Sequence, residues 1–286
     1  MTVFIVLASG LLLLAGVVLI AAWGGASVRP PPGPSVAALP PEARSGRLNR
    51  ALRRYAWWAN VACFAAFVSA VLIAWPGGRL VMRVLAMTSP AQSQGMLTEA
   101  GAVVGLPTVD GTLSLLVFGG LPAAFAATFI YLLVHRLLPP GRLNGPLAGL
   151  AALLLLGSFL EPFRANNIDF TIVGPGLLSV ALFAVLAVLL GALVAAAAGW
   201  YSQRLPLPSG RAAKAYWPLV AGMVFLPAGI LIGIGALIVV AFSAIVRSPH
   251  GWASRKHVWV GRSLLGLAVL AALPAFIGSL GFILFR

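Results

Sequence analysis

The sequence has few charged residues and almost no cysteine. Of its 286 residues only 8% are Asp, Glu, Lys or Arg, whereas an ordinary soluble domain has about 25%. A soluble domain of this length needs a polar surface, and 19 basic and 5 acidic residues cannot supply one. A single cysteine, Cys63, excludes an intrachain disulfide and a cysteine-based metal cage. The composition therefore excludes a soluble enzyme, a disulfide-rich secreted protein and a disordered chain.

Motifs for common cofactors are also missing. The chain has no Walker A loop, GxGxxG, HExxH or GxSxG pattern. Its three histidines, at positions 135, 250 and 257, are too scattered for a zinc site and lack carboxylate or thiol support. We therefore expect no metal and no cofactor.

Hydrophobic residues, in contrast, make up 61% of the chain. They predict an all-α fold, a polytopic transmembrane helix bundle of about seven spans, because most of the apolar stretches approach the ~20 residues that cross a bilayer core. The predicted spans are Val3–Trp23, Trp57–Trp75, Leu113–Val134, Pro146–Leu160, Gly176–Trp200, Trp217–Val246 and Ser263–Phe285. The first is expected to be an uncleaved helix, since no basic residue precedes it. Residues 1–25 thus form a first helix, 26–56 a cytoplasmic segment, and 57–286 a six-span bundle with an external loop at 76–111.

Two of these spans are irregular. Pro146–Leu160 is short, at about 22 Å of helix. Trp217–Val246 contains Pro227, and the preferred interpretation is one long helix kinked there. The alternative is a re-entrant hairpin that turns at 227–229. The hairpin would place the basic loop 247–262 on the cytoplasmic side.

The distribution of basic residues predicts an orientation in the cell membrane, because cytoplasmic loops are rich in Lys and Arg. With the N-terminus outside and the C-terminus inside, seven basic residues fall outside and twelve inside. The twelve are Arg29, Arg44, Arg47, Arg50, Arg53, Arg54, Arg136, Arg142, Arg204, Arg211, Lys214 and Arg286. Four of the five acids fall outside.

The cytoplasmic segment combines a spacer with a basic helix. Residues 30–41 hold six prolines in twelve residues and are expected to be extended. Residues 42–56 form an amphipathic pattern with an apolar face that includes Leu48, Leu52 and Tyr55. Its cationic face is predicted to contact anionic membrane lipids and is made of Arg44, Arg47, Arg50, Arg53 and Arg54. The alternative is a topology signal without a lipid role. Nucleic acid is not an expected partner, because no supporting fold accompanies the charge.

Small residues recur at a spacing of four within several spans. The deepest series is Ala62, Ala66, Ala70 and Ala74, and shorter ones include Gly191, Ala195 and Gly199, and Gly145 and Gly149. Such faces let helices approach closely in lipid. They predict contacts within the bundle or between copies in a homo-oligomer.

One polar cluster occurs at the outer boundary of the predicted membrane region. Glu161 and Asp169 are candidate catalytic carboxylates, which could divide acid and base roles if burial separated their pKa values. Arg164, Asn166 and Asn167 are candidate substrate-binding residues between them. The alternative is a solvated turn between two spans, with Arg164 pairing locally.

Residues 97–139 (LTEAG, GTLSLLVFGG and YLLVHRLLP) and 166–186 (NNIDFTIVGPGLLSVALFAVL) carry a resemblance. They resemble uncharacterised polytopic membrane proteins of GC-rich actinobacteria. The resemblance implies a bacterial plasma-membrane setting and no activity. The leading hypothesis is a non-catalytic scaffold or handler of lipids or other apolar molecules. The alternatives are a membrane-embedded enzyme of cyclase or isomerase type that uses Glu161 and Asp169, and a small-molecule transporter.

Overall fold

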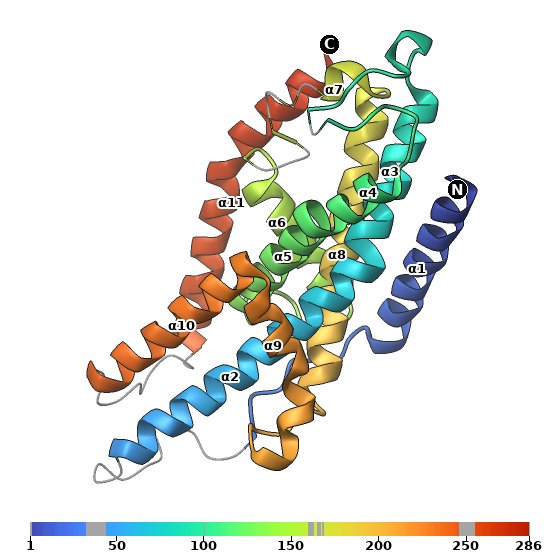
Figure 1. The fold of residues 1–286 in the computed structure, drawn as a ribbon. Coiled ribbons are helices and arrows are strands. Elements are labelled where there is room, and N and C mark those ends of the chain that lie inside the picture. Colours follow the sequence, from blue (N-terminus) through green and yellow to red (C-terminus); the bar gives the residue numbers. More distant parts are fainter. Residues whose placement is uncertain are drawn as a thin grey trace.

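The computed structural model describes residues 2–32, 44–99, 101–159, 163, 164, 167, 169–245 and 255–285. Within these residues all regular structure is helical, and the nearest approach to a strand is an isolated bridge between Leu97 and Val103 (Figure 1). The prediction of an all-α helical bundle is therefore confirmed.

The helices are unequal in length. Five are long and apolar enough to cross a membrane, and the bent pair α9–α10 would make a sixth span, so the predicted seven spans are not confirmed. The α-helices are α1 (Thr2–Trp23), α2 (Arg44–Ser69), α3 (Trp75–Thr88), α4 (Val109–Ser114), α5 (Leu121–Val134), α6 (Asn144–Leu156), α7 (Asp169–Ile172), α8 (Gly176–Ser202), α9 (Trp217–Val224), α10 (Leu226–Ile245) and α11 (Arg255–Leu284).

Helix α2 does not end at Trp75, as predicted for the second span. It continues through a π-helical segment, η2 (Ala70–Ala74), directly into α3. Pro76 lies in the first turn of α3, where its missing N–H is tolerated, and the wider π turn before it accommodates the lost hydrogen bond. A second π-helical segment, η4 (Leu115–Gly120), leads in the same way into α5, which has Pro122 in its first turn. As a result, the external loop expected at 76–111 begins only at Ser89.

Helices α6 and α8 make the closest helix contact of the described chain. A Cβ atom added to Gly191 would lie 2.5 Å from the Cα of Gly149 and 2.6 Å from the carbonyl oxygen of Gly145. Such backbone contact is possible only with glycine on both helices. Ala66, Ala70 and Ala74 of the alanine series are also buried, in the core formed mainly by α2, α5 and α8.

The segment predicted as one kinked span consists of two helices. The chain changes direction by 109° between α9 and α10. The turn is centred on Phe225, whose ψ of 101° leaves the helical region, and Pro227 lies in the first turn of α10. Proline is tolerated in the first turn of a helix, so Pro227 begins a new helix here, whereas the prediction was a kink in a continuous one.

The bundle has two ends of different charge. We call the end that holds Glu99 and Asp169 the acidic end, and the opposite end, with Arg29 and Arg204, the basic end. The last turns of α8 pack on the segment after α1 at the basic end, where Ala26 lies directly against Gly199. The start of α8 packs at the acidic end, where Gly176 lies against Ile283 of α11.

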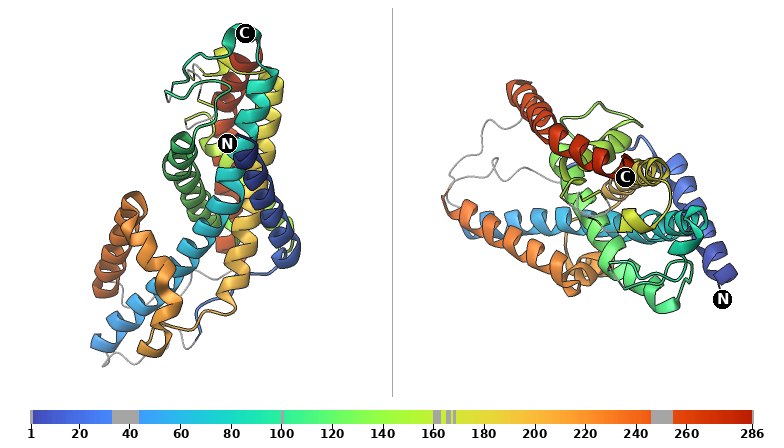
Figure 2. Two further views of the ribbon diagram at one scale, coloured as in Figure 1. Left: turned by 45° about the vertical axis from the view of Figure 1, so that its right-hand side comes forward. Right: turned by 90° about the horizontal axis from the view of Figure 1, so that it is seen from above.

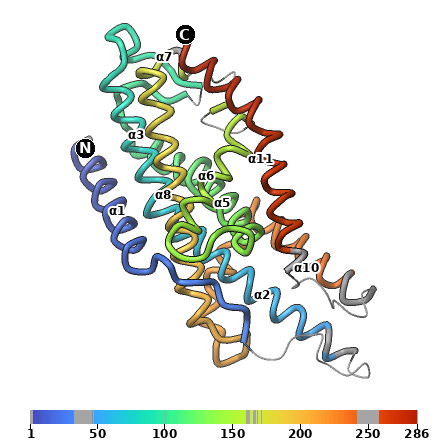
Figure 3. Tube along the Cα trace, turned by 180° about the vertical axis from the view of Figure 1, so that it is seen from behind, coloured from blue at the N-terminus to red at the C-terminus, as the bar shows by residue number. Residues whose placement is uncertain are grey.

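Both ends of the chain lie toward the acidic end. Helix α11 starts beside the α5–α6 connection, where Arg262 Nε donates to the Leu137 carbonyl at 2.8 Å, and it ends beside Gly176. Helix α1 runs in the opposite direction, down to the basic end, as Figures 1 and 3 show. Both termini thus lie toward one end of the bundle, while the expected orientation, with the N-terminus outside and the C-terminus inside, stays a prediction.

Candidate functional site

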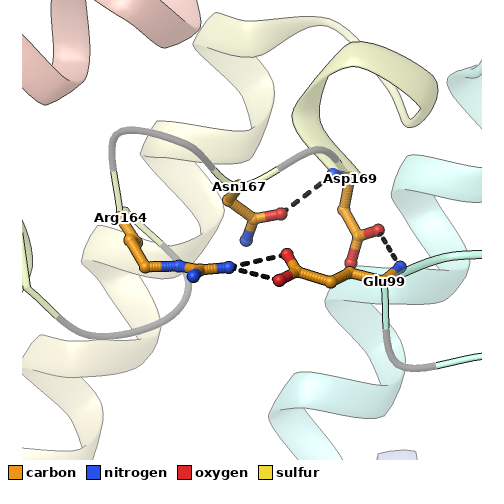
Figure 4. Close-up of polar contacts among 4 residues, drawn as sticks. All are labelled: Glu99, Arg164, Asn167 and Asp169. Atoms are coloured by element: carbon orange, nitrogen blue, oxygen red, sulfur yellow. Dashed lines mark hydrogen bonds and ion pairs between the residues drawn. The ribbon is translucent and has the colours of Figure 1, made fainter.

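The polar cluster predicted around residues 161–169 lies at the acidic end, where two connections meet. One is the α3–α4 connection, residues 89–108, and the other is the segment before α7. Figure 4 shows their contact, in which side chains from the two connections form one hydrogen-bonded group. The longer connection therefore lies against the other as a cap on this end of the bundle.

An ion pair joins the two connections. Arg164 Nη2 donates to both carboxylate oxygens of Glu99, at 2.6 and 2.7 Å. The side chains remain 35% and 46% exposed, so water screens much of their attraction. The pair fixes the position of the connections more than it stabilises the fold.

Asp169 makes the second contact between them. Its Oδ1 accepts a hydrogen bond from the backbone N–H of Glu99 at 2.7 Å. Its own N–H donates to Oδ1 of Asn167 at 2.9 Å, and Asn167 is only 4% exposed. Asp169 and Asn167 thus form a hydrogen-bonded turn, which binds the tip of the α3–α4 connection at Glu99.

A third contact joins the end of α3 to the segment after α7. The N–H of Gly174 donates to Ser89 Oγ at 2.8 Å, at the end of α3. Gly174 has a φ of +62°, and a Cβ on it would meet Leu85. Glycine is required there by both conformation and space. Phe163 is fully buried beside Phe170 and Phe276 and anchors the segment from below.

The structure brings together Arg164, Asn167 and Asp169 of the predicted site. Glu161 and Asn166 lie outside the described residues, so the predicted convergence of Glu161 with Asp169 stays a prediction. Glu99 was not among the predicted site residues, although its loop was expected on the same side as Glu161 and Asp169. The position of Glu99 near the tip of the longest predicted loop was the signal that could have indicated it as a partner of Arg164.

Glu99 and Asp169 form a structural clamp between the two connections. Both oxygens of Glu99 face a guanidinium, and Asp169 accepts a backbone N–H, so each already has a protein donor. Within the described part of the chain no three His, Cys, Asp or Glu residues are grouped as metal ligands.

A second polar group lies in the protein interior near the basic end, and it holds the segment before α9. Asn60 of α2 is fully buried. Its Nδ2 donates to the Ala215 carbonyl at 3.0 Å and to the Tyr201 hydroxyl at 3.1 Å, and its Oδ1 accepts from the Leu219 N–H at 3.0 Å. One amide side chain therefore fixes both the irregular backbone and the first turn of α9.

Two aromatic residues extend this anchor. The buried Trp57 donates through Nε1 to the Leu205 carbonyl at 3.0 Å. The Tyr216 hydroxyl donates to the Pro206 carbonyl at 2.7 Å. Backbone polar groups buried outside regular helices need protein partners, and these side chains supply them.

The predicted basic amphipathic segment forms the start of α2 and is continuous with it. Its apolar face is covered at Tyr55, whose hydroxyl donates to the Ile232 carbonyl of α10 at 2.6 Å, whereas Leu48 is exposed. Arg53 Nε donates to the Pro208 carbonyl at 2.9 Å. The side chains of Arg44 and Arg47 lie outside the described residues.

Comparison of the chain with protein-family profiles, with curated proteins and with solved structures finds no significant match.

Proposed function

We propose that this chain is a non-catalytic, multi-pass integral membrane protein that binds lipids at its basic end, which faces the cytoplasm. The observation that carries the proposal is the charge difference between the two ends of the bundle. Helices of this length and hydropathy support the membrane setting. The resemblance to actinobacterial membrane proteins favours a bacterial plasma membrane.

The hairpin formed by α9 and α10 strengthens the charge difference. If the basic end is cytoplasmic, only Arg79, Arg83, Arg164 and Arg286 of the nineteen basic residues belong to the outer side. The fifteen on the cytoplasmic side are Arg29, Arg44, Arg47, Arg50, Arg53, Arg54, Arg136, Arg142, Arg204, Arg211, Lys214, Arg247, Arg255, Lys256 and Arg262. A kinked single span would leave seven outside, so the positive-inside rule favours the hairpin.

Aromatic rings at the basic end support the same placement. Trp23 stacks on Trp200 at 4.4 Å, and the Arg204 guanidinium lies 4.4 Å from the Trp200 ring. The Arg262 guanidinium lies 5.7 Å from the ring of Trp259 on α11. Tryptophan beside arginine is typical of the membrane–water interface, where headgroup phosphates are available.

The proposal is tested by topology and by lipid content. An externally active reporter should be silent when fused after Asn49 and active after Ala91. Protein purified in mild detergent should retain phosphatidylglycerol in preference to phosphatidylcholine, as native mass spectrometry detects. A reporter active after Asn49, or equal retention of both lipids, would overturn the proposal.

A small-molecule transporter is the second candidate, and the broken pair α9–α10 is the observation that favours it. Discontinuous helices line binding sites in many transporters. A cysteine introduced at Phe225, in a chain that also carries Cys63→Ala, should then react with a water-soluble maleimide. No reaction in intact membranes would count against a water-filled pathway at the break. The enzyme alternative gains no support from the described carboxylates, which hold the clamp.

A further inference from the structure

We infer that α10 and the basic half of α2 form one two-helix unit that binds an anionic phospholipid of the cytoplasmic leaflet. Arginines of α2 contact the lipid phosphate, and the outer face of α10 contacts the acyl chains. This inference rests on the cytoplasmic placement proposed for the basic end. It differs from the sequence prediction, in which the apolar face of residues 42–56 itself entered the membrane.

The two helices pair in antiparallel fashion. Gly222, just before the turn, lies against Cys63 of α2, and farther along Gly235 lies against the Tyr55 ring. The hydrogen bond from Tyr55 to the Ile232 carbonyl fixes the register of the pair. Seen from above in Figure 2, both helices extend to the same side, away from α8. Helix α10 therefore covers the apolar face of the basic segment at Tyr55, while Leu48, nearer the start of α2, is exposed.

The outer surface of α10 is apolar, and none of the residues that the structure describes covers it. Its exposed side chains are aliphatic and include Leu226, Ile230, Leu231, Ile234, Leu237 and Ile238, of which Leu237 is 70% exposed. A helix of 20 residues spans about 30 Å. This surface is stable only if it is withdrawn from water.

Positive charge lies next to this apolar surface. Arg50, Arg53 and Arg54 belong to the part of α2 that pairs with α10, and the bond from Arg53 to Pro208 holds that part against the segment before α9. The carboxylates of Glu99 and Asp169 are at the other end, and Asp110 lies at the start of α4, beside the first turns of α3. An apolar helix beside guanidinium groups matches acyl chains below a phosphate, to which arginine binds strongly.

A second copy of the chain fits this surface less well. The chain carries a formal net charge of +14, and two copies facing through this unit would bring their arginines together. An anionic lipid supplies the missing negative charge, and a second copy adds more positive charge. We therefore assign an anionic lipid, and not a second copy of the chain, to the outer surface of α10.

The charge half of the inference is tested with the full chain in detergent titrated with phosphatidylglycerol. Arg50→Gln with Arg54→Gln should weaken the apparent affinity roughly 30-fold, at about 1 kcal/mol for each arginine. Arg136→Gln with Arg142→Gln, an exposed pair at the same end but outside the unit, is the matched control and should change it less than threefold. Equal losses in both variants would overturn the inference and leave general lipid binding at the basic end intact.

The apolar half is tested by a spin label at Leu237→Cys in a Cys63→Ala chain reconstituted in vesicles that contain phosphatidylglycerol. The label should be reached by oxygen and shielded from an aqueous nickel chelate. A label at Ser209→Cys should show the opposite preference. Access of the chelate to position 237 would overturn the inference. Shielding from both reagents would also overturn it, because a second copy of the chain would then cover α10.

Discussion

At the scale of single residues, the chain uses its few polar side chains to hold irregular backbone. Asn60 satisfies three partners around the segment before α9, and Asp169 and Glu99 join two connections at the acidic end. These are the positions where a chain of mostly apolar residues gains specificity, because an apolar side chain packs equally well in many registers.

Asn60 is expected to be the most sensitive polar residue of the interior. Asn60→Ala leaves the Leu219 N–H and the Ala215 carbonyl without this partner, which should cost about 1–3 kcal/mol. The melting temperature in detergent should fall, and proteolysis between residues 205 and 216 should accelerate. The control is Asn49→Ala on the exposed face of the same helix. An equal change in both variants would contradict the anchoring role.

The clamp at the acidic end predicts rescue by charge reversal. Glu99→Arg or Arg164→Glu alone should make the α3–α4 connection more sensitive to protease, because like charges would then face each other. The double variant should restore resistance. The melting temperature should change little, since exposed ion pairs contribute about 0–1 kcal/mol. Absence of rescue would show that the pair does not hold the connection.

His135 predicts a pH dependence of stability. Burial lowers the pKa of His135, Arg136 adds to that shift, and the hydrogen bond to the Leu132 carbonyl opposes it. The unfolded chain therefore takes up a proton first as the pH falls below the ordinary value of 6.5. Stability conferred by the neutral imidazole is present above that pH and is lost below it. His135→Gln should flatten the dependence of the melting temperature between pH 8 and 5.5, and an unchanged slope would contradict this assignment.

At the scale of helices, the close contact of α6 with α8 restricts which side chains the positions between them can hold. A helical α6 of 13 residues gains its stability by lying against a longer neighbour, and glycines on both helices allow that approach. The glycines of α11 have another environment, since a Cβ on Gly278 meets nothing within 4 Å.

These two environments predict opposite effects of the same substitution. Gly191→Ala places a methyl group against the backbone of α6 and should destabilise the protein by about 1–3 kcal/mol. Gly278→Ala should be neutral or stabilising by up to about 1 kcal/mol, because alanine favours the helix. Thermal unfolding in one detergent compares them. A stable Gly191→Ala variant would mean that α6 and α8 can separate without loss.

At the scale of the whole molecule, the α9–α10 hairpin decides on which side the chain ends. A reporter that is active only outside should be silent after Ser254 and active when fused to the C-terminus. The kinked-span alternative gives the opposite result at both positions. The fusion after Ala91 serves as the external control, and activity after Ser254 would remove the hairpin.

The sequence was sufficient for the fold class and for most helix positions, because long apolar runs leave few alternatives. Trp217–Val246 was harder, since the hydropathy of a crossing helix and of a hairpin is the same. The turn of 109° at Phe225 and the hydrogen bond from Tyr55 to Ile232 are visible only in the structure. The Pro76 boundary was missed because π-helical turns leave no mark in composition. The partner of Arg164 was missed because Glu99 is 65 residues away in sequence.

The two π-helical segments have a consequence for the phase of the helices that contain them. Each π turn holds one residue more than an α turn needs, so the side chains beyond it are rotated by about 100° from the direction an unbroken α-helix would give them. In α3 this rotation turns Arg79 toward Thr112. Arg79 Nε donates to Thr112 Oγ1 at 2.9 Å. Removal of Val71 alone would let η2 revert to an α-helix and turn Arg79 away from α4. The one additional residue in η2 thus directs the Arg79 guanidinium to its acceptor, Thr112.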